Sequence, residues 1–255
     1  MPRTLQHAFA ATALTGLSLY LWRIAYSSSD WAVLALIPLA VVMFIGVWPL
    51  NFEPWKAHLQ LALRHDSPLT TLLTGQFRSA ILSHSFTFVA IILLAWQALT
   101  AAASEAVIIV ATFFITGCIY SAGYDFLQRH FHHPFARAFA ASLVSWLVAL
   151  PFTLIVAGYT WAWGSQPGAM LDAGLQEALQ IGLANLPERG GWIASILAVP
   201  YGYEAAKLWG VVQLQDYPVA GVLFSLDTAL FGFVLCRTAI IVAVFVETHV
   251  IKVRA

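Results

Sequence analysis

Three acidic residues recur in the same short sequence pattern, which makes them the first candidates for chemistry. Glu53, Asp125 and Glu204 each follow an aromatic residue that is itself preceded by Asn or Gly, and Lys or Gln stands three residues later. Each pattern closes a long apolar run, so a repeated two-helix unit is predicted. A membrane boundary partly desolvates a carboxylate and favours its neutral form. We therefore expect these acids to exchange protons or bind a substrate amine, unless each simply pairs with a neighbouring basic residue.

Two further charges, Asp227 and Arg237, lie inside the last apolar segment. An ion at that depth costs about 2.5–3.5 kcal/mol on insertion scales, so each is expected to face a partner or a wet cavity. Their separation corresponds to roughly 15 Å along a helix, which is too far for direct pairing. Each is therefore predicted to meet a different helix, either for function or in a structural ion pair.

A cavity at the interface of the repeats would bring the acids together with aromatic hydroxyl groups. We expect it to be lined by Asp125, Glu204, Tyr120, Tyr201 and Tyr203. Such a cavity would hold a small-molecule substrate near the level of the bilayer.

The histidines are weaker candidates for chemistry than the acids. His130 and His133 would share a face of a helix, but two imidazoles without carboxylate or thiolate ligands make an incomplete metal site. His84 lies alone inside a predicted span, and haem would need a second buried histidine opposite it. Motifs for serine, zinc or ATP chemistry are missing. We therefore expect no cofactor and no metal, with His130 and His133 as the weak candidates for one, and enzymatic activity stays only as an alternative.

Composition determines the elements that must position these residues. The chain of 255 residues is 60% hydrophobic and only 9% charged, with a mean hydropathy of +0.80. Too little polar surface remains to cover a soluble domain, which predicts an integral membrane protein in contact with the lipid bilayer. The net charge of +0 and the lack of a basic run argue against nucleic acid as a partner.

Seven segments are long and apolar enough to be predicted as spans. The first is expected to be retained, because no small-residue cleavage site follows it. One integral domain, 1–255, would contain hairpins at about 1–56, 79–129 and 137–207 and a last helix at 219–247. The predicted spans are Ala8–Tyr26, Trp31–Leu50, Ser79–Leu99, Ala106–Tyr124, Ala138–Trp161, Trp192–Val212 and Val219–Val246.

The distribution of basic residues predicts an orientation. Most of them fall on the side of the N-terminus, which is therefore expected in the cytoplasm, and seven spans would place the C-terminus outside. The basic residues on that first side are Arg3, Lys56, Arg64, Arg78, Arg129, Arg137 and Lys207, and those on the other side are Arg23, Arg189, Lys252 and Arg254.

Two segments have special patterns. Met170–Gln180 alternates apolar and polar faces, as is typical of a helix at a headgroup boundary. The last span carries a row of small residues from Gly221 to Ala243, so another helix can approach it closely. That helix would come from this chain, from a partner subunit or from a second copy.

The residues also resemble bacterial inner-membrane exporters of the AlaE (L-alanine exporter) type and, more distantly, the proteobacterial antimicrobial compound efflux (PACE) family. The similarity lies in His7-Ala8 with Ala10 and Thr12, in Trp48-Pro49, and in Gly117-Cys118-Ile119-Tyr120 with Asp125, Arg129 and Phe131. It covers scattered positions over roughly the first half of the chain. The resemblance implies proton-linked export across a bacterial inner membrane, although such exporters have only two hairpins.

Together these observations predict an all-α, polytopic membrane bundle that acts as a secondary exporter of a small molecule or amphiphile, with protons as the candidate driving ion. One alternative is a non-catalytic membrane subunit or assembly factor that binds partner helices. Another is a lipid-modifying enzyme with its histidine loop at the membrane surface.

Overall fold

The computed structural model describes residues 3–63, 76–163, 170, 172–187, 191–214 and 217–251, and the basic residues Arg64, Arg189, Lys252 and Arg254 lie outside this part. Within it the chain forms α-helices and no strand, which confirms the all-α class. A 3-10 turn, η1 (Asp30–Ala35), precedes the second helix, and a π-helical turn, η3 (Val246–Ile251), extends the last one. The helices are α1 (Arg3–Ala25), α2 (Ile37–Ala62), α4 (Gln76–Thr100), α5 (Ala103–Leu127), α6 (His133–Trp163), α7 (Leu175–Ala184), α8 (Trp192–Gln213) and α9 (Pro218–Phe245).

Six segments of the described chain are long and apolar enough to cross a membrane, so the prediction of a polytopic membrane protein is confirmed. They are Thr4–Ala25, Asp30–Ala62, Ser79–Thr100, Ala103–Leu127, His133–Gly158 and Ser225–Val250. In lipid, a helix satisfies its backbone polar groups internally, and for that reason apolar runs of this length become helices.

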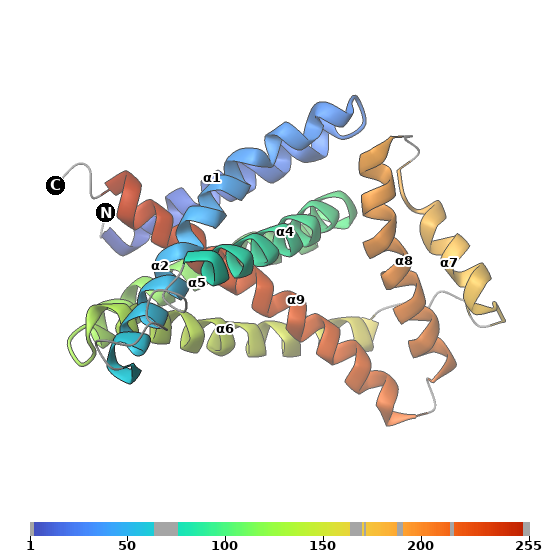
Figure 1. Ribbon diagram of the computed structural model, residues 1–255. Coiled ribbons are helices and arrows are strands. Elements are labelled where there is room, and N and C mark those ends of the chain that lie inside the picture. The colour runs from blue at the N-terminus through green and yellow to red at the C-terminus, as the bar shows by residue number, and fades with distance from the viewer. Residues whose placement is uncertain are drawn as a thin grey trace.

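The seventh predicted span, Trp192–Val212, folds as α8 but is not apolar enough to count among the six. Glu204 and Lys207 stand near its middle and lower its hydropathy. The start of α1 and the end of α9 lie at the same end of the bundle, as Figure 1 shows, and six crossings would produce this arrangement. The prediction that the two termini lie on opposite sides is therefore wrong.

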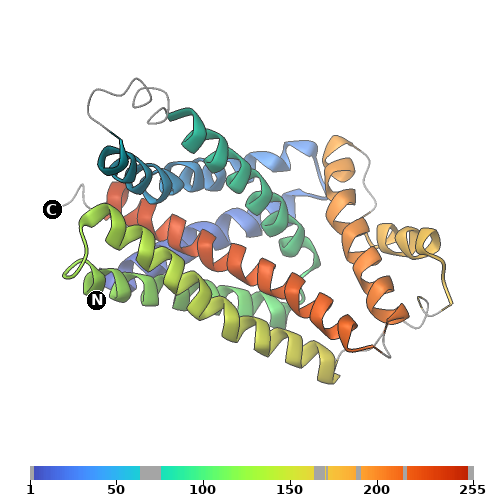
Figure 2. The same cartoon turned by 60° about the horizontal axis from the view of Figure 1, so that its bottom comes forward.

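The hairpin of α7 and α8 lies across the opposite end of the bundle (Figures 1 and 2). Of these two helices, α8 contacts α4 and α9, while α7 packs on the outer side of α8. The amphipathic segment predicted at a headgroup boundary overlaps α7, which is amphipathic but begins only at Leu175. An amphipathic helix outside the ends of the spans has the position that a membrane surface favours.

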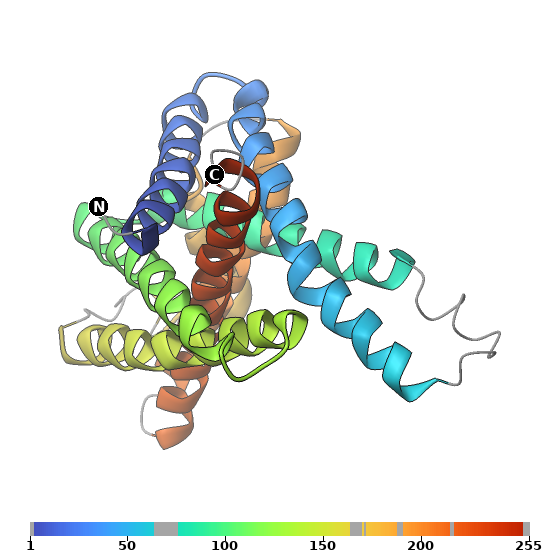
Figure 3. The same ribbon diagram turned by 90° about the vertical axis from the view of Figure 1, so that its left-hand side faces the viewer.

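Helix α9 runs through the centre of the bundle and contacts α1, α2, α5 and α6 (Figure 3). Cys236 and Ala239 are fully buried, and Gly46 of α2 faces the backbone carbonyl of Ile241 with no room for a Cβ atom. The row of small residues therefore lets this chain's own helices approach, as predicted for a centrally packed last span.

Neighbours in sequence are not the main neighbours in space. The most extensive contacts of α1 are with α5, and those of α6 are with α9, whereas α1 and α2 contact each other only slightly. Helices α2 and α4 pack together along one side of the bundle. The three repeated sequence patterns consequently lie in three different surroundings, in α2, α5 and α8.

Candidate functional site

The three recurring acids do not converge on one chamber. Glu53 lies in the last third of α2 and Asp125 in the last turn of α5, and both of these helices end at the side of the chain termini. Glu204 belongs to α8, at the opposite end of the bundle (Figure 1). The predicted shared cavity of Asp125 and Glu204 is therefore absent from the described structure.

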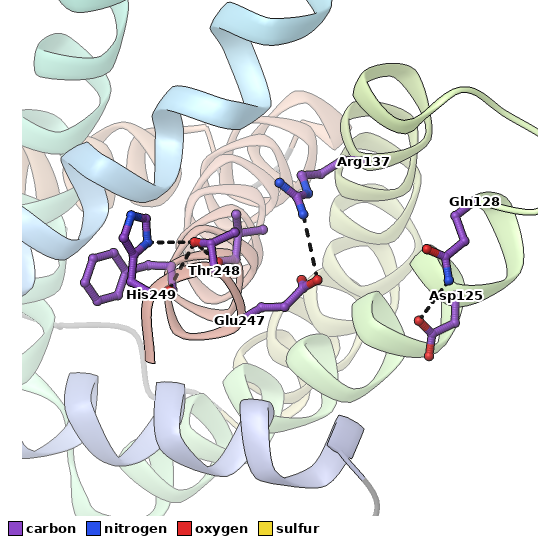
Figure 4. A network of polar contacts seen from close by, with 8 residues as sticks. Asp125, Gln128, Arg137, Glu247, Thr248 and His249 are labelled. Atoms are coloured by element: carbon purple, nitrogen blue, oxygen red, sulfur yellow. Dashed lines mark hydrogen bonds and ion pairs between the residues drawn. The ribbon is translucent and has the colours of Figure 1, made fainter. Parts of the chain in front are cut away.

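Asp125 and the neighbouring histidines lie on the outside of the bundle. The Asp125 carboxylate is exposed and accepts one long hydrogen bond, 3.4 Å, from the amide of Gln128, and this pair lies apart from the nearby Arg137–Glu247 contact (Figure 4). His130 and His133 contact the rings of Phe126 and Tyr124 respectively. No group of three metal-ligating side chains occurs among the described residues.

Glu204 and Asp227, by contrast, meet in one ionic cluster formed by Tyr203, Glu204, Lys207 and Asp227. The Lys207 ammonium contacts Asp227 Oδ2 at 2.8 Å and also pairs with Glu204 one turn earlier on α8. The Tyr203 hydroxyl donates to Asp227 Oδ1 at 2.9 Å. Three of these four residues were predicted as site residues, and the structure joins α8 to α9 through them.

The ionic cluster has the chemistry of a structural joint. Its lysine is shared by two carboxylates, and desolvation, together with the hydrogen bond to Asp227, raises the pKa of Tyr203 to about 12. Tyr201, on the same helix, is buried, and burial raises the pKa of its phenol. Neither phenol therefore ionises near neutral pH. The cluster pairs its charges internally and leaves no cation for a ligand.

A different site lies at the level of the spans, where α2, α4, α6 and α9 enclose a cavity of about 490 Å³. Its lining combines four polar side chains with an apolar wall. The polar residues are Asn51, Ser79, Ser142 and Arg237, and the apolar ones are Val47, Leu50, Trp55, Leu82, Phe86, Phe233 and Ile241.

Arg237 is the one charged residue of that lining. It is half-buried in the middle of the apolar segment Ser225–Val250, and it forms no ion pair or hydrogen bond with any residue that the structure describes. Arg237 thus lines a cavity, whereas the partner on another helix that was predicted for it is not found among the described residues. The predicted partner for Asp227 is also confirmed, since Lys207 reaches it from another helix.

A second buried arginine was not predicted as a site residue. Arg137, near the start of α6, is 4% exposed and contacts Glu247 of the π-helical turn η3 at 3.7 Å (Figure 4). Its guanidinium also lies 5.3 Å from the centre of the Tyr124 ring. Arg137 and Glu247 are far apart in sequence, and no spacing pattern connects them. In the sequence, only the position of Arg137 next to a predicted span could have marked it as a candidate.

Tyr120 of α5 lies in the core beside Tyr124. Its side chain is almost fully buried, and its ring stacks on that of Tyr124 with a centre distance of 6.1 Å. The Tyr120 hydroxyl has no hydrogen-bond partner among the described residues. The two stacked rings therefore extend from the Arg137 guanidinium into the core.

An apolar groove of about 770 Å³ lies between α2, α4 and the start of α8. His84 lines it, but its Nδ1 atom lies 2.9 Å from the carbonyl of Ala80 on the same helix, and its ring packs on Phe44. The histidine is thus satisfied locally. The groove contrasts with the cavity at Arg237, which carries a charge.

Comparison with known proteins gives no match: no family model fits the chain, and neither a characterised protein nor a solved structure matches it. The resemblance to small exporters stays a prediction.

Proposed function

We propose that this membrane protein is a secondary transporter of a small molecule or amphiphile, and that the cavity between α2, α4, α6 and α9 is its substrate site. One observation carries the proposal: a cavity at the depth of the spans is lined by a charged side chain without an ion-pair partner among the described residues. Charges at this depth are costly and typically mark a substrate or ion path. Binding cavities also combine a largely apolar wall with a few polar groups, as this one does.

The inner membrane of a bacterium and a cytoplasmic N-terminus belong to the same proposal. They are supported by the excess of basic residues at the end of the bundle that holds the start of α1. Proton coupling would involve groups next to the cavity rather than Asp125, which lies outside the bundle, or Glu204, which pairs with Lys207.

Transport can be tested with proteoliposomes of the purified full-length chain. Single-chain amphiphiles labelled with a dithionite-sensitive fluorophore would report movement between leaflets, with and without an imposed pH gradient. We expect protein-dependent movement of at least one headgroup class. Equal rates in protein-free vesicles for every class would refute the transport role.

A matched pair of variants links that movement to the cavity. Ser142 and Ser85 are both exposed serines of spans, but only Ser142 lines the cavity. Ser142→Phe should fill part of the space and slow transport, whereas Ser85→Phe should leave it unchanged. Equal effects of the two substitutions would show that the cavity is not the path.

The second candidate is a non-catalytic subunit that binds partner helices, and the apolar groove beside α8 favours it. A groove lined by Trp22, Phe44, Phe88 and Trp192 offers an apolar surface that lipid or a partner helix can cover. Native mass spectrometry after mild extraction distinguishes the two functions, because a stoichiometric partner is expected only for the subunit.

A further inference from the structure

We propose that the cavity at Arg237 recognises an oxyanion, a phosphate or carboxylate carried as the headgroup of an amphiphile. This inference deepens the proposed transport function and rests on the same cavity. It concerns which class of ligand enters, and it can be tested without measuring transport.

The first argument is charge. Arg237 lines the cavity, and the described residues offer it no carboxylate partner. Glu247, which follows Arg237 on the π-helical extension of α9, contacts Arg137 instead. An unpaired guanidinium in a region of low dielectric strongly attracts an anion, because the electrostatic interaction is little screened there.

The second argument is hydrogen bonding. A guanidinium presents its N–H groups in a planar fork that fits the two oxygen atoms of a carboxylate or phosphate. Asn51, Ser79 and Ser142 line the same cavity and bring an amide and two hydroxyl groups. All three can donate to an oxyanion, and none carries a negative charge that would repel one.

The third argument is the apolar wall. Leu82, Phe86 and Phe233 line the cavity together with the polar groups, and no charge other than that of Arg237 is present in the lining. A soluble ion would leave this wall uncovered, whereas an alkyl chain would bury it and gain the corresponding hydrophobic free energy. The combination favours an amphiphile over a free ion.

The test is equilibrium binding to the purified full-length chain in nanodiscs of zwitterionic lipid. Three probes separate the possibilities: dodecyl phosphate, dodecyltrimethylammonium with the same tail, and inorganic phosphate. Trp55 lines the cavity, and quenching of its fluorescence by a spin-labelled fatty acid reports whether the cavity is occupied. The variant Trp55→Phe shows how much of the total quenching comes from this tryptophan. The unlabelled probes are then added as competitors.

We expect dodecyl phosphate to displace the quencher saturably, and dodecyltrimethylammonium not to displace it. Arg237→Gln should weaken binding at least tenfold, while Arg237→Lys, which keeps the charge, should retain most of it. Retained helicity and a single peak in size-exclusion chromatography verify that both variants fold. Unchanged binding to Arg237→Gln, or equal displacement by the cationic probe, would overturn the inference.

The remaining outcomes separate the source of the anion and the two proposals. Displacement by inorganic phosphate as strong as that by dodecyl phosphate would keep the oxyanion site and assign it to a soluble ion. Binding that depends on Arg237 without any transport would support the site and remove the transport role. Transport that is indifferent to Arg237→Gln would support the transport role and remove the oxyanion site.

Discussion

Two regions of the molecule differ in whether their cation has an acidic partner. They are the joint between α8 and α9 and the cavity between α2, α4, α6 and α9. At the joint, Lys207 lies between two carboxylates, and Tyr203 completes the coordination of Asp227. In the cavity, Arg237 meets hydroxyl and amide groups but no acid among the described residues. The two cations therefore have different roles. The paired Lys207 holds helices together, whereas the unpaired Arg237 is available to a ligand.

The α7–α8 hairpin and the rest of the bundle (α1, α2, α4, α5, α6 and α9, called the body below) also differ in how their helices are held together. In the body, Gly46 lets α2 reach the backbone of α9, and in the hairpin Gly182 lets α7 reach Ala205 of α8. The body has apolar packing around α9 on several sides, while the hairpin is attached through two buried residues at the start of α8, Ile193 and Leu197, and through the ionic cluster. Damage to the body should therefore be global, and damage to the hairpin local.

The largest effect is expected for Gly46→Ala. A methyl group at this position would collide with the backbone carbonyl of Ile241, so α2 would have to move away from α9. Overpacking of this kind costs about 1–3 kcal/mol, and we expect the upper part of that range. Thermal unfolding followed by circular dichroism in detergent measures it. Gly16→Ala on α1, where nothing lies within 4 Å, is the control and should be neutral or stabilising; equal losses would contradict this description of the α2–α9 contact.

A smaller loss is expected for Lys207→Met, which leaves Asp227 beside α8 without its cation. The lost charged hydrogen bond corresponds to the lower end of the range of about 1.5–3 kcal/mol, because both side chains keep some contact with solvent. Proteolysis of the α7–α8 hairpin should accelerate while the body stays resistant. If the pair is structural, the further change Asp227→Asn should restore part of the stability, and an additive loss would argue against the pairing.

Gly182→Ala tests the hairpin without altering any charge. The added methyl group would overlap the Cβ atom of Ala205, so α7 must move away from α8. We expect faster proteolysis of α7 and an unchanged unfolding midpoint for the body. Gly210→Ala on α8 has nothing within 4 Å and serves as the control. A loss of midpoint as large as that of Gly46→Ala would show that the hairpin and the body unfold together.

The smallest effect is expected at high pH. The pKa of Tyr203 is raised above its ordinary value of 10 to about 12, so its hydrogen bond to Asp227 is fully present below pH 10 and is lost as the pH rises through 12. In the wild-type protein the contact between α8 and α9 should weaken between pH 10 and pH 12, and the Tyr203→Phe variant should not show this weakening. The difference in absorbance near 295 nm between the two proteins follows the titration, and a midpoint near 10 would show that the hydroxyl is free.

Much of the fold follows from the sequence, because in lipid an apolar run of sufficient length has no alternative to a helix. The exception, α8, is instructive. Its apolar residues predict a span, but Glu204 and Lys207 near its middle belong to a surface joint, and only the position of Asp227 on another helix shows this.

The candidate site was less accessible to sequence analysis. Arg237 and Asp227 could be selected from their depth alone, since burying an ion demands a reason. The repeated pattern around Glu53, Asp125 and Glu204 was misleading, because similar residues at helix ends need not lie at the same end of a bundle. Arg137 and Glu247 have no local signal that connects them, so their contact depends on how α6 and α9 pack.

Helix α9 and its π-helical extension carry Asp227, Arg237 and Glu247 in turn, and each faces a different neighbour: α8, the cavity and α6. A rigid rod cannot turn at one of these points without turning at the others. A ligand that drew Arg237 sideways would therefore pull on the hairpin at one face of the membrane and on Arg137 at the other. Through the central helix, a displacement of Arg237 would reach the contacts at both ends of the bundle.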